Sequence, residues 1–252
     1  DDMLLPDGII RLFELIKGYP EVDFFYVNSY HLQAEFLEKY PHPFDTVNLP
    51  KNMEPFSMRT ESGTLQFHEL VDPKISFDFL GGMFLSVFRK KNWDESCHVL
   101  DPNAINSNAI FSHFDNTFPH IKIWANAFSS SVAYFNTNPL NVCLNGAREW
   151  SLMSPFILSV RLVEALDIYR STGLSLGSYF YCKNFALRNY ASDMIKILIN
   201  KNIYDFDLHL LKHYLKCSFY PNVYLSLFYF IGRRIRKFLI KFSQFQPEKK
   251  IC

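Results

Sequence analysis

Two adjacent carboxylates, Asp1 and Asp2, stand before three apolar residues and Pro6. Carboxylate oxygens are the ligands that a hard cation such as Mg²⁺ or Mn²⁺ prefers, and the cation often keeps waters and substrate phosphates as its other ligands. The pair therefore predicts a site where a divalent cation is held against a diphosphate. The alternative is a solvated turn in which both carboxylates favour the dipole of the following helix.

Later segments add candidates for binding an acceptor and for moving a proton. Gly81 and Gly82 precede an apolar strand, where glycine lets the backbone approach a ligand closely. Asp115 and His120 flank the start of a predicted helix, and either side chain can take a proton from a hydroxyl within hydrogen-bond reach. The alternatives are a plain turn for the glycines, a helix cap for Asp115 and a structural role for His120.

Three more side chains suit recognition of a nucleotide or a sugar. Arg148 can bind phosphate oxygens through its planar set of donors, and Trp150 can stack on a flat ligand. Trp93 can offer a platform for a sugar. The alternatives are a surface ion pair for Arg148 and core packing for Trp93.

The elements that must position these residues follow from apolar periodicity and from proline and glycine. Apolar residues at helical spacing predict a helix between Pro6 and Gly18, and a second helix beginning at Pro119. The predicted strands cover residues 22–30, 85–88, 132–135 and 140–144. Proline-rich residues 41–66 and polar residues 101–117 are predicted loops.

Helical periodicity dominates the chain after residue 154. The predicted helices cover residues 155–171, 176–201, 205–217 and 222–245. We therefore predict an α/β part over residues 1–152, followed by an all-helical extension over residues 153–252.

The last predicted helix, residues 222–245, is basic and rich in aromatic residues. Five cations lie within nine residues and alternate with apolar side chains: Arg233, Arg234, Arg236, Lys237 and Lys241. Such a helix suits an anionic membrane surface. Alternatively, it packs on the domain with its cations in water. Its apolar run is shorter than the roughly 20 residues that a membrane span needs.

Composition narrows the class of protein. Hydrophobic residues make up 48% and charged residues 20% of 252 residues, which is typical of a globular chain. The net charge of +1 provides no general attraction to nucleic acid, so no nucleic-acid partner is predicted. The five cysteines form no C-x-x-C pair, which favours a reducing compartment over a disulfide framework or a zinc site.

The order of the motifs over residues 1–150 resembles family 2 glycosyltransferases of the GT-A fold, especially bacterial enzymes that build O-antigen and capsular polysaccharides. Residues 1–6 (DDMLLP) are similar to the aspartate motif of that family, and residues 79–84 (FLGGMF) to its acceptor-side segment. Residues 114–120 (FDNTFPH) occupy the position of its acidic base. There a single Asp followed by Asn replaces the family's usual Glu-Asp pair.

The resemblance implies inverting transfer of a sugar from a nucleoside-diphosphate donor to a hydroxyl of a glycan or lipid-linked acceptor, assisted by Mg²⁺ or Mn²⁺. It implies Asp2 as the direct metal ligand, with Asp1 assisting the metal or the nucleotide. Asp115 becomes the base, with His120 as a second candidate.

The same resemblance places Gly81, Gly82 and Trp93 at the acceptor, and Arg148 and Trp150 at the donor diphosphate. Residues 1–152 would form the C-terminal part of a GT-A domain, so we expect activity of a longer parent protein at the cytoplasmic face of the membrane. The competing hypothesis is a non-catalytic, membrane-associated module that keeps the fold. A metal-dependent hydrolase is disfavoured because the eight histidines form no recognisable ligand spacing.

Overall fold

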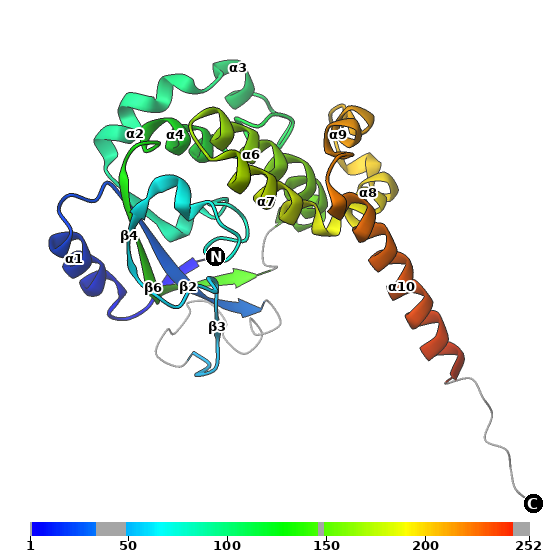
Figure 1. The fold of residues 1–252 in the computed structure, drawn as a ribbon, viewed down its shortest axis with the longest axis horizontal. Coiled ribbons are helices and arrows are strands. Elements are labelled where there is room, and N and C mark those ends of the chain that lie inside the picture. The colour runs from blue at the N-terminus through cyan, green and yellow to red at the C-terminus, as the bar shows by residue number, and fades with distance from the viewer. Residues whose placement is uncertain (1, 34–48, 146–148, 244–252) are drawn as a thin grey trace, which may run out of the picture.

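A six-stranded mixed sheet forms the centre of the computed structural model, which describes residues 2–33, 49–145 and 149–243 (Figure 1). The long strands β2 and β6 run parallel, β1 and β4 pair antiparallel with β6, and β3 and β5 pair antiparallel with β2. The strands are β1 (Asp2–Leu4), β2 (Phe24–Gln33), β3 (Glu54–Pro55), β4 (Gly63–Gln66), β5 (Ser86–Phe88) and β6 (Val132–Asn145).

Helices cover the sheet and then form most of the chain after β6. They are α1 (Gly8–Gly18), α2 (Lys90–Ser96), α3 (Pro102–Ile105), α4 (Pro119–Ala127), α5 (Ser154–Phe156), α6 (Leu162–Ser171), α7 (Leu176–Ala186), α8 (Tyr190–Ile199), α9 (Leu210–Cys217) and α10 (Pro221–Ser243). A π-helical turn, Ile157–Arg161, joins α5 to α6. In Figure 1, α10 projects away from the rest of the molecule.

Alternation along β2 sends neighbouring side chains into two different clusters. Phe24 faces α4, where its ring lies 5.2 Å from Trp124 and 5.3 Å from Phe128. Phe25 faces the other side and joins Tyr134 in a smaller cluster beside α1. Side chains of successive strand residues point to opposite faces of a sheet. Phe24 and Phe25 therefore pack towards α4 on one face and α1 on the other.

The predicted mixed α/β chain with a helical C-terminal region is confirmed. The first helix and the helix at Pro119 form as predicted, and Trp124 and Phe128 of the second are fully buried. The main hydrophobic cluster includes residues from both sides of position 152, among them Phe24 and Leu166. The predicted division into two parts at that position stays a prediction.

The prediction of two strands over 132–135 and 140–144 is wrong, because both belong to β6. Residue pairing with β2 moves from Val27 opposite Asn136 to Ser29 opposite Asn141, so β6 carries three extra residues as a bulge. Pro139 lies inside this bulge and therefore needs no ladder hydrogen bond. The turn signal in the sequence marks a bulge within one strand.

Two predicted loops also contain regular structure. Strands β3 and β4 fall within the predicted loop 41–66, whose first part, to residue 48, lies outside the described residues. The short helix α3 falls within the predicted loop 101–117.

The buried side chain of Asn28 stabilises the bulge through three hydrogen bonds. Its Oδ1 accepts hydrogen bonds from the backbone amides of Ser29 at 3.0 Å and Ser57 at 2.9 Å. Its Nδ2 donates to the carbonyl of Thr137 at 3.0 Å. One amide group therefore satisfies three backbone groups where the sheet ladder is interrupted.

We predict that Asn28→Ala lowers the free energy of unfolding by about 2–4 kcal/mol, because it leaves buried backbone groups unpaired. The matched control is Asn126→Ala, which removes one exposed hydrogen bond to Lys122 and changes stability by less than about 1 kcal/mol. Urea unfolding monitored by circular dichroism measures both. Equal losses would contradict the proposed role of Asn28.

Candidate functional site

A cavity of about 710 Å³ gathers residues from segments far apart in the sequence. Four of the residues predicted from sequence line it: Asp2, Gly81, Gly82 and His120. Aromatic and aliphatic side chains supply most of the remaining wall, including Phe56, Phe77, Phe84, Phe118 and Leu162. A largely apolar wall with a few polar groups is typical of a small-molecule site.

Asp78 is a lining residue that the sequence analysis missed. Its carboxylate Oδ1 accepts a hydrogen bond from the Ser76 hydroxyl at 2.6 Å. The same hydroxyl oxygen accepts the backbone amide of Leu80 at 2.8 Å, so Ser76 ties the carboxylate to the following turn. The sequence feature that indicates this residue is an acidic side chain inside an apolar run directly before Gly81 and Gly82.

The turn that carries Asp78 has an unusual backbone. Phe79 and Leu80 have φ values of 50° and 67°, in the left-handed region, although neither is glycine. Both are fully buried. Such a conformation costs free energy and persists only where the surrounding contacts enforce it, which is common at functional sites.

Two hydrogen bonds hold this turn from outside. The hydroxyl of Tyr169, on α6, donates to the carbonyl of Phe79 at 3.1 Å. His120, on α4, bonds the carbonyl of Gly81 through Nε2 at 3.1 Å, and since a carbonyl only accepts, this nitrogen carries the proton. Two helices therefore position the turn at the cavity.

The two titratable groups at this turn have shifted pKa values. Burial raises the pKa of Asp78, and hydrogen bonds from Ser76 and from the amides of Gly82 and Gly81 partly oppose that rise. A carboxylate whose pKa is raised is a better proton acceptor. Burial lowers the pKa of His120 to about 4, so its imidazole is neutral at pH 7.

Glycine is sterically required at position 81. A Cβ there would lie 2.9 Å from the carbonyl oxygen of Asp78, which is backbone and cannot easily move. At Gly82 a Cβ would lie 2.7 Å from the ring of Phe84 and 3.1 Å from Oδ2 of Asp78. The glycine pair thus lets the turn close around the Asp78 carboxylate.

Asp115 and Trp93 do not line this cavity. The buried Asp115 carboxylate is 2.7 Å from Nζ of Lys122 and accepts the amide of Asp101 at 2.7 Å. It does not cap α4, whose N-cap residue is Phe118 and has no side-chain cap. Trp93 stacks on Phe88 with ring centres 5.0 Å apart and packs against the main core.

The remaining predicted residues lie outside what the structure describes. Asp1 and Arg148 are among the residues not described, and so is the side chain of Trp150. Over residues 2–33, 49–145 and 149–243, no group of three or more His, Cys, Asp or Glu side chains lies close enough to hold a metal ion. The predicted Asp1–Asp2 metal site stays a prediction, and Asp2 is exposed and lines the cavity.

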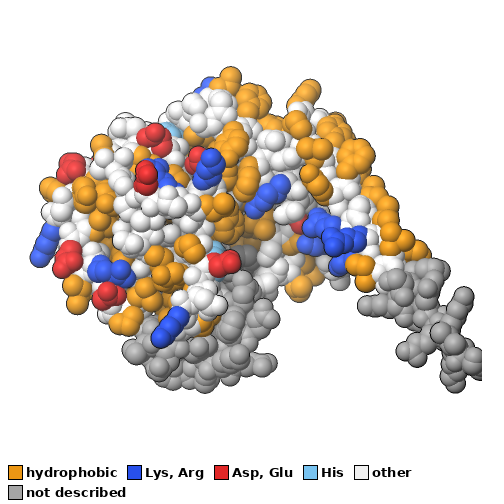
Figure 2. Space-filling view, turned by 60° about the horizontal axis from the view of Figure 1, so that its bottom comes forward, with side chains coloured by type: hydrophobic (Ala, Val, Ile, Leu, Met, Phe, Trp, Pro, Cys, Tyr) orange, Lys and Arg blue, Asp and Glu red, His pale blue; other side chains and the backbone are white. Residues whose placement is uncertain are grey.

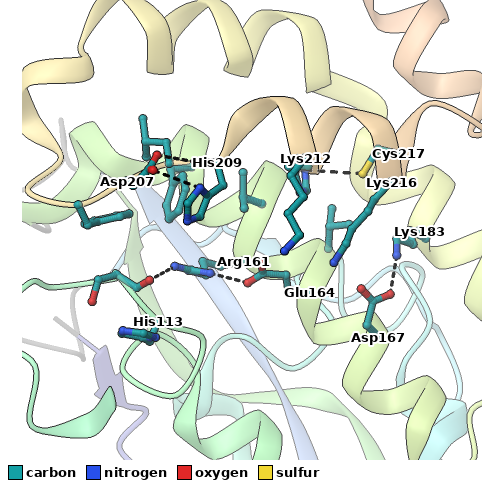
Figure 3. A pocket seen from close by; sticks show the side chains of 17 residues that line it. His113, Arg161, Glu164, Asp167, Lys183, Asp207, His209, Lys212, Lys216 and Cys217 are labelled. Carbon is teal, nitrogen blue, oxygen red and sulfur yellow. Dashed lines mark hydrogen bonds and ion pairs between the residues drawn. The ribbon is translucent and has the colours of Figure 1, made fainter. Parts of the chain in front are cut away.

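A second cavity, of about 390 Å³, lies between α6, α7 and α9 and is lined by charged groups (Figure 3). Its two buried cations form ion pairs. Arg161 pairs with Glu164, and Nζ of Lys183 lies 2.5 Å from Oδ1 of Asp167. Lys212 and Lys216 point into it from α9.

This second cavity also contains a Cys–His pair, but the pair is not an activated nucleophile. Nε2 of His213 lies 3.6 Å from Sγ of Cys217, yet it bonds the carbonyl of Ser159 at 2.8 Å and therefore carries a proton. Burial raises the pKa of the Cys217 thiol to about 11. Thiolate chemistry at neutral pH is therefore disfavoured here.

Comparisons with known proteins assign no family to the chain. No protein-family model, curated protein or solved structure matches it.

We predict that alanine lowers the free energy of unfolding at Gly81 but not at Gly177. Gly81→Ala should lower the free energy of unfolding by about 1–3 kcal/mol, because the new Cβ collides with backbone. Gly177→Ala should leave it unchanged or raise it by up to about 1 kcal/mol, since nothing lies within 4 Å of a Cβ in that helix. Chemical denaturation distinguishes the two, and equal effects would contradict the steric account.

A pH dependence follows from the neutral, buried His120. Between about pH 6.5 and 4 the unfolded chain binds a proton that the folded chain does not, so folding stability falls as pH falls. The loss at pH 4 is about 3 kcal/mol for this group. His120→Gln should make the fall in unfolding free energy over this range shallower by about that amount, leaving the part that His213 contributes, since burial lowers its pKa to about 4 as well, whereas His98→Gln, an exposed control, should leave the fall unchanged. An unchanged profile in His120→Gln would contradict the assignment.

Proposed function

We propose that the chain carries the metal and acceptor side of an inverting glycosyltransferase of the GT-A type. The reaction transfers a sugar from a nucleoside-diphosphate donor to a hydroxyl of a glycan or lipid-linked acceptor. The observation that carries this proposal is the meeting of Asp2, Gly81, Gly82 and His120 with Asp78 around one cavity. All except Asp78 belong to segments that the sequence resemblance names, which are far apart in the chain.

Asp2 would hold Mg²⁺ or Mn²⁺ at the cavity, because this residue, the first of β1, lines it. A divalent cation, when bound, stabilises the leaving diphosphate as a Lewis acid. Its remaining ligands would come from the diphosphate, from water and from Asp1.

Asp78 is the proposed base that removes the proton from the acceptor hydroxyl. It lines the cavity, its carboxylate is fixed by Ser76, and burial raises its pKa. Asp115, the base implied by the resemblance, forms an ion pair with Lys122 instead of facing the cavity. We therefore propose that the base is Asp78 and not Asp115. The two assignments predict different effects of Asp78→Asn and Asp115→Asn on sugar transfer.

The aromatic wall would bind the acceptor sugar and exclude water. Phe77 lies parallel to Phe56 with ring centres 4.5 Å apart, and Phe84 meets Phe56 edge to face. Flat apolar surfaces of this kind pack against the C–H faces of sugar rings. They also lower the local dielectric constant, which strengthens the interaction of the Asp2 carboxylate with a bound cation.

The test is sugar transfer by the full-length protein with Mn²⁺, screened over several nucleotide sugars. Asp2→Ala should abolish metal-dependent transfer. Asp78→Asn should lower kcat by at least about 100-fold, the usual contribution of a general base. Asp115→Asn should keep kcat within a few-fold and lower the free energy of unfolding by about 1–3 kcal/mol.

The control is Asp7→Asn, which removes an exposed carboxylate paired with Arg11 and should change neither property. If Asp115→Asn abolishes transfer while Asp78→Asn does not, the base is Asp115. If no donor supports transfer by the full-length wild-type protein, the proposal is wrong and the non-catalytic hypothesis is favoured.

A further inference from the structure

We infer that α8, α9 and α10 together form a docking surface for an anionic lipid bilayer. This surface lies outside the proposed catalytic cavity, and the inference does not depend on sugar transfer. It rests on three observations: an exposed apolar stripe, a groove that continues it, and a cluster of cations on the same helix.

The stripe consists of exposed apolar residues along α10 at positions 224, 228, 231, 235 and 238. Spacings of four and three residues keep these side chains on one face of a helix. Phe228 and Phe238 are 70% and 67% exposed, and Ile235 is 54% exposed. Ser226, about 160° around the helix from Tyr224, is buried against the protein.

An apolar groove of about 390 Å³ between α8, α9 and α10 extends this stripe. Its α10 wall includes Tyr224 and Leu227, so the groove opens at the first turns of the stripe. Leu198 of α8 and Leu211 of α9 also line it and are 60% and 72% exposed. No charged residue lines the groove. Contiguous exposed apolar surface of this kind marks an interaction site.

The cations lie beside or opposite the stripe. At 100° per residue from Tyr224, Arg233 and Lys237 lie about 180° and 140° around the helix, and Arg234 lies about 80° around it, at the flank of the stripe. Figure 2 shows hydrophobic side chains along one edge of the projecting arm and Lys or Arg side chains gathered on the other. Long cationic side chains can reach lipid phosphates while the apolar face enters the interface.

Charge favours a bilayer over a second copy of the chain as the occupant. The stripe spacing would also suit a helical partner, but residues 221–243 contain five cations and no Asp or Glu. Two such helices cannot form ion pairs with each other and repel instead. Anionic lipid attracts each cation near its surface. Within the residues that the structure describes, no helix is long and apolar enough to cross a membrane.

Vesicle co-sedimentation of the full-length protein tests this inference. Phosphatidylcholine vesicles with phosphatidylglycerol should bind it far more tightly than phosphatidylcholine alone, and added salt should weaken binding. Arg233→Gln/Arg234→Gln should weaken binding by about 30-fold, at about fivefold for each cation. Phe228→Ser/Phe238→Ser should weaken it by at least about tenfold.

Matched controls remove exposed residues elsewhere: Lys90→Gln/Lys91→Gln for charge and Met58→Ser/Ile110→Ser for apolar area. These variants should bind vesicles like the wild type. Equal binding to neutral vesicles, or equal losses in the controls, would overturn the inference. So would a stable dimer in lipid-free sedimentation that Phe228→Ser/Phe238→Ser dissociates, because a second copy would then occupy the surface. Donor turnover is not measured, so this result stands apart from the test of catalysis.

Discussion

The left-handed backbone of Phe79 and Leu80 is the constraint on which the arrangement of the cavity depends. A left-handed conformation costs an ordinary residue about 1–2 kcal/mol, so two in succession must be compensated by their surroundings. Burial of both side chains supplies part of this compensation. Two hydrogen bonds supply more: the Leu80 amide donates to the Ser76 hydroxyl oxygen, and the Tyr169 hydroxyl donates to the carbonyl of Phe79. The turn is therefore held both by Ser76, which precedes it in the chain, and by Tyr169 of α6.

The chemistry proposed for the cavity follows from this turn. The turn places Asp78 in the lining of the cavity, and Gly81 and Gly82 allow the backbone to close around its carboxylate without a clash. His120 completes the closure by donating to the carbonyl of Gly81, and burial keeps its imidazole neutral at pH 7. The cavity therefore combines a fixed carboxylate, a second carboxylate from Asp2 and an aromatic wall.

Much of the fold was predictable from sequence because apolar residues recur at the positions of a helix or strand that are buried. The buried positions of α4, including Trp124, follow this pattern, and the helical C-terminal region does too. The continuity of β6 was not predictable, since Pro139 and its polar neighbours signal a turn, and only pairing with β2 shows a bulge. Asp78 was missed because a left-handed turn of non-glycine residues contradicts local preference and is enforced by distant helices. The partner of Asp115, Lys122, was equally hidden in the sequence.

The two proposals concern different parts of the chain and converge on a lipid-linked acceptor, with the cavity beside the sheet and the docking surface on α8–α10. The proposed catalysis would depend most on a cation held by Asp2 at the cavity. Crystals of the full-length protein soaked with Mn²⁺ and a nucleoside diphosphate test this directly through anomalous scattering. We predict a manganese peak about 2.1 Å from an Asp2 carboxylate oxygen, with the diphosphate in the same cavity. Manganese and diphosphate bound elsewhere, for example beside Lys212 and Lys216, would contradict the account.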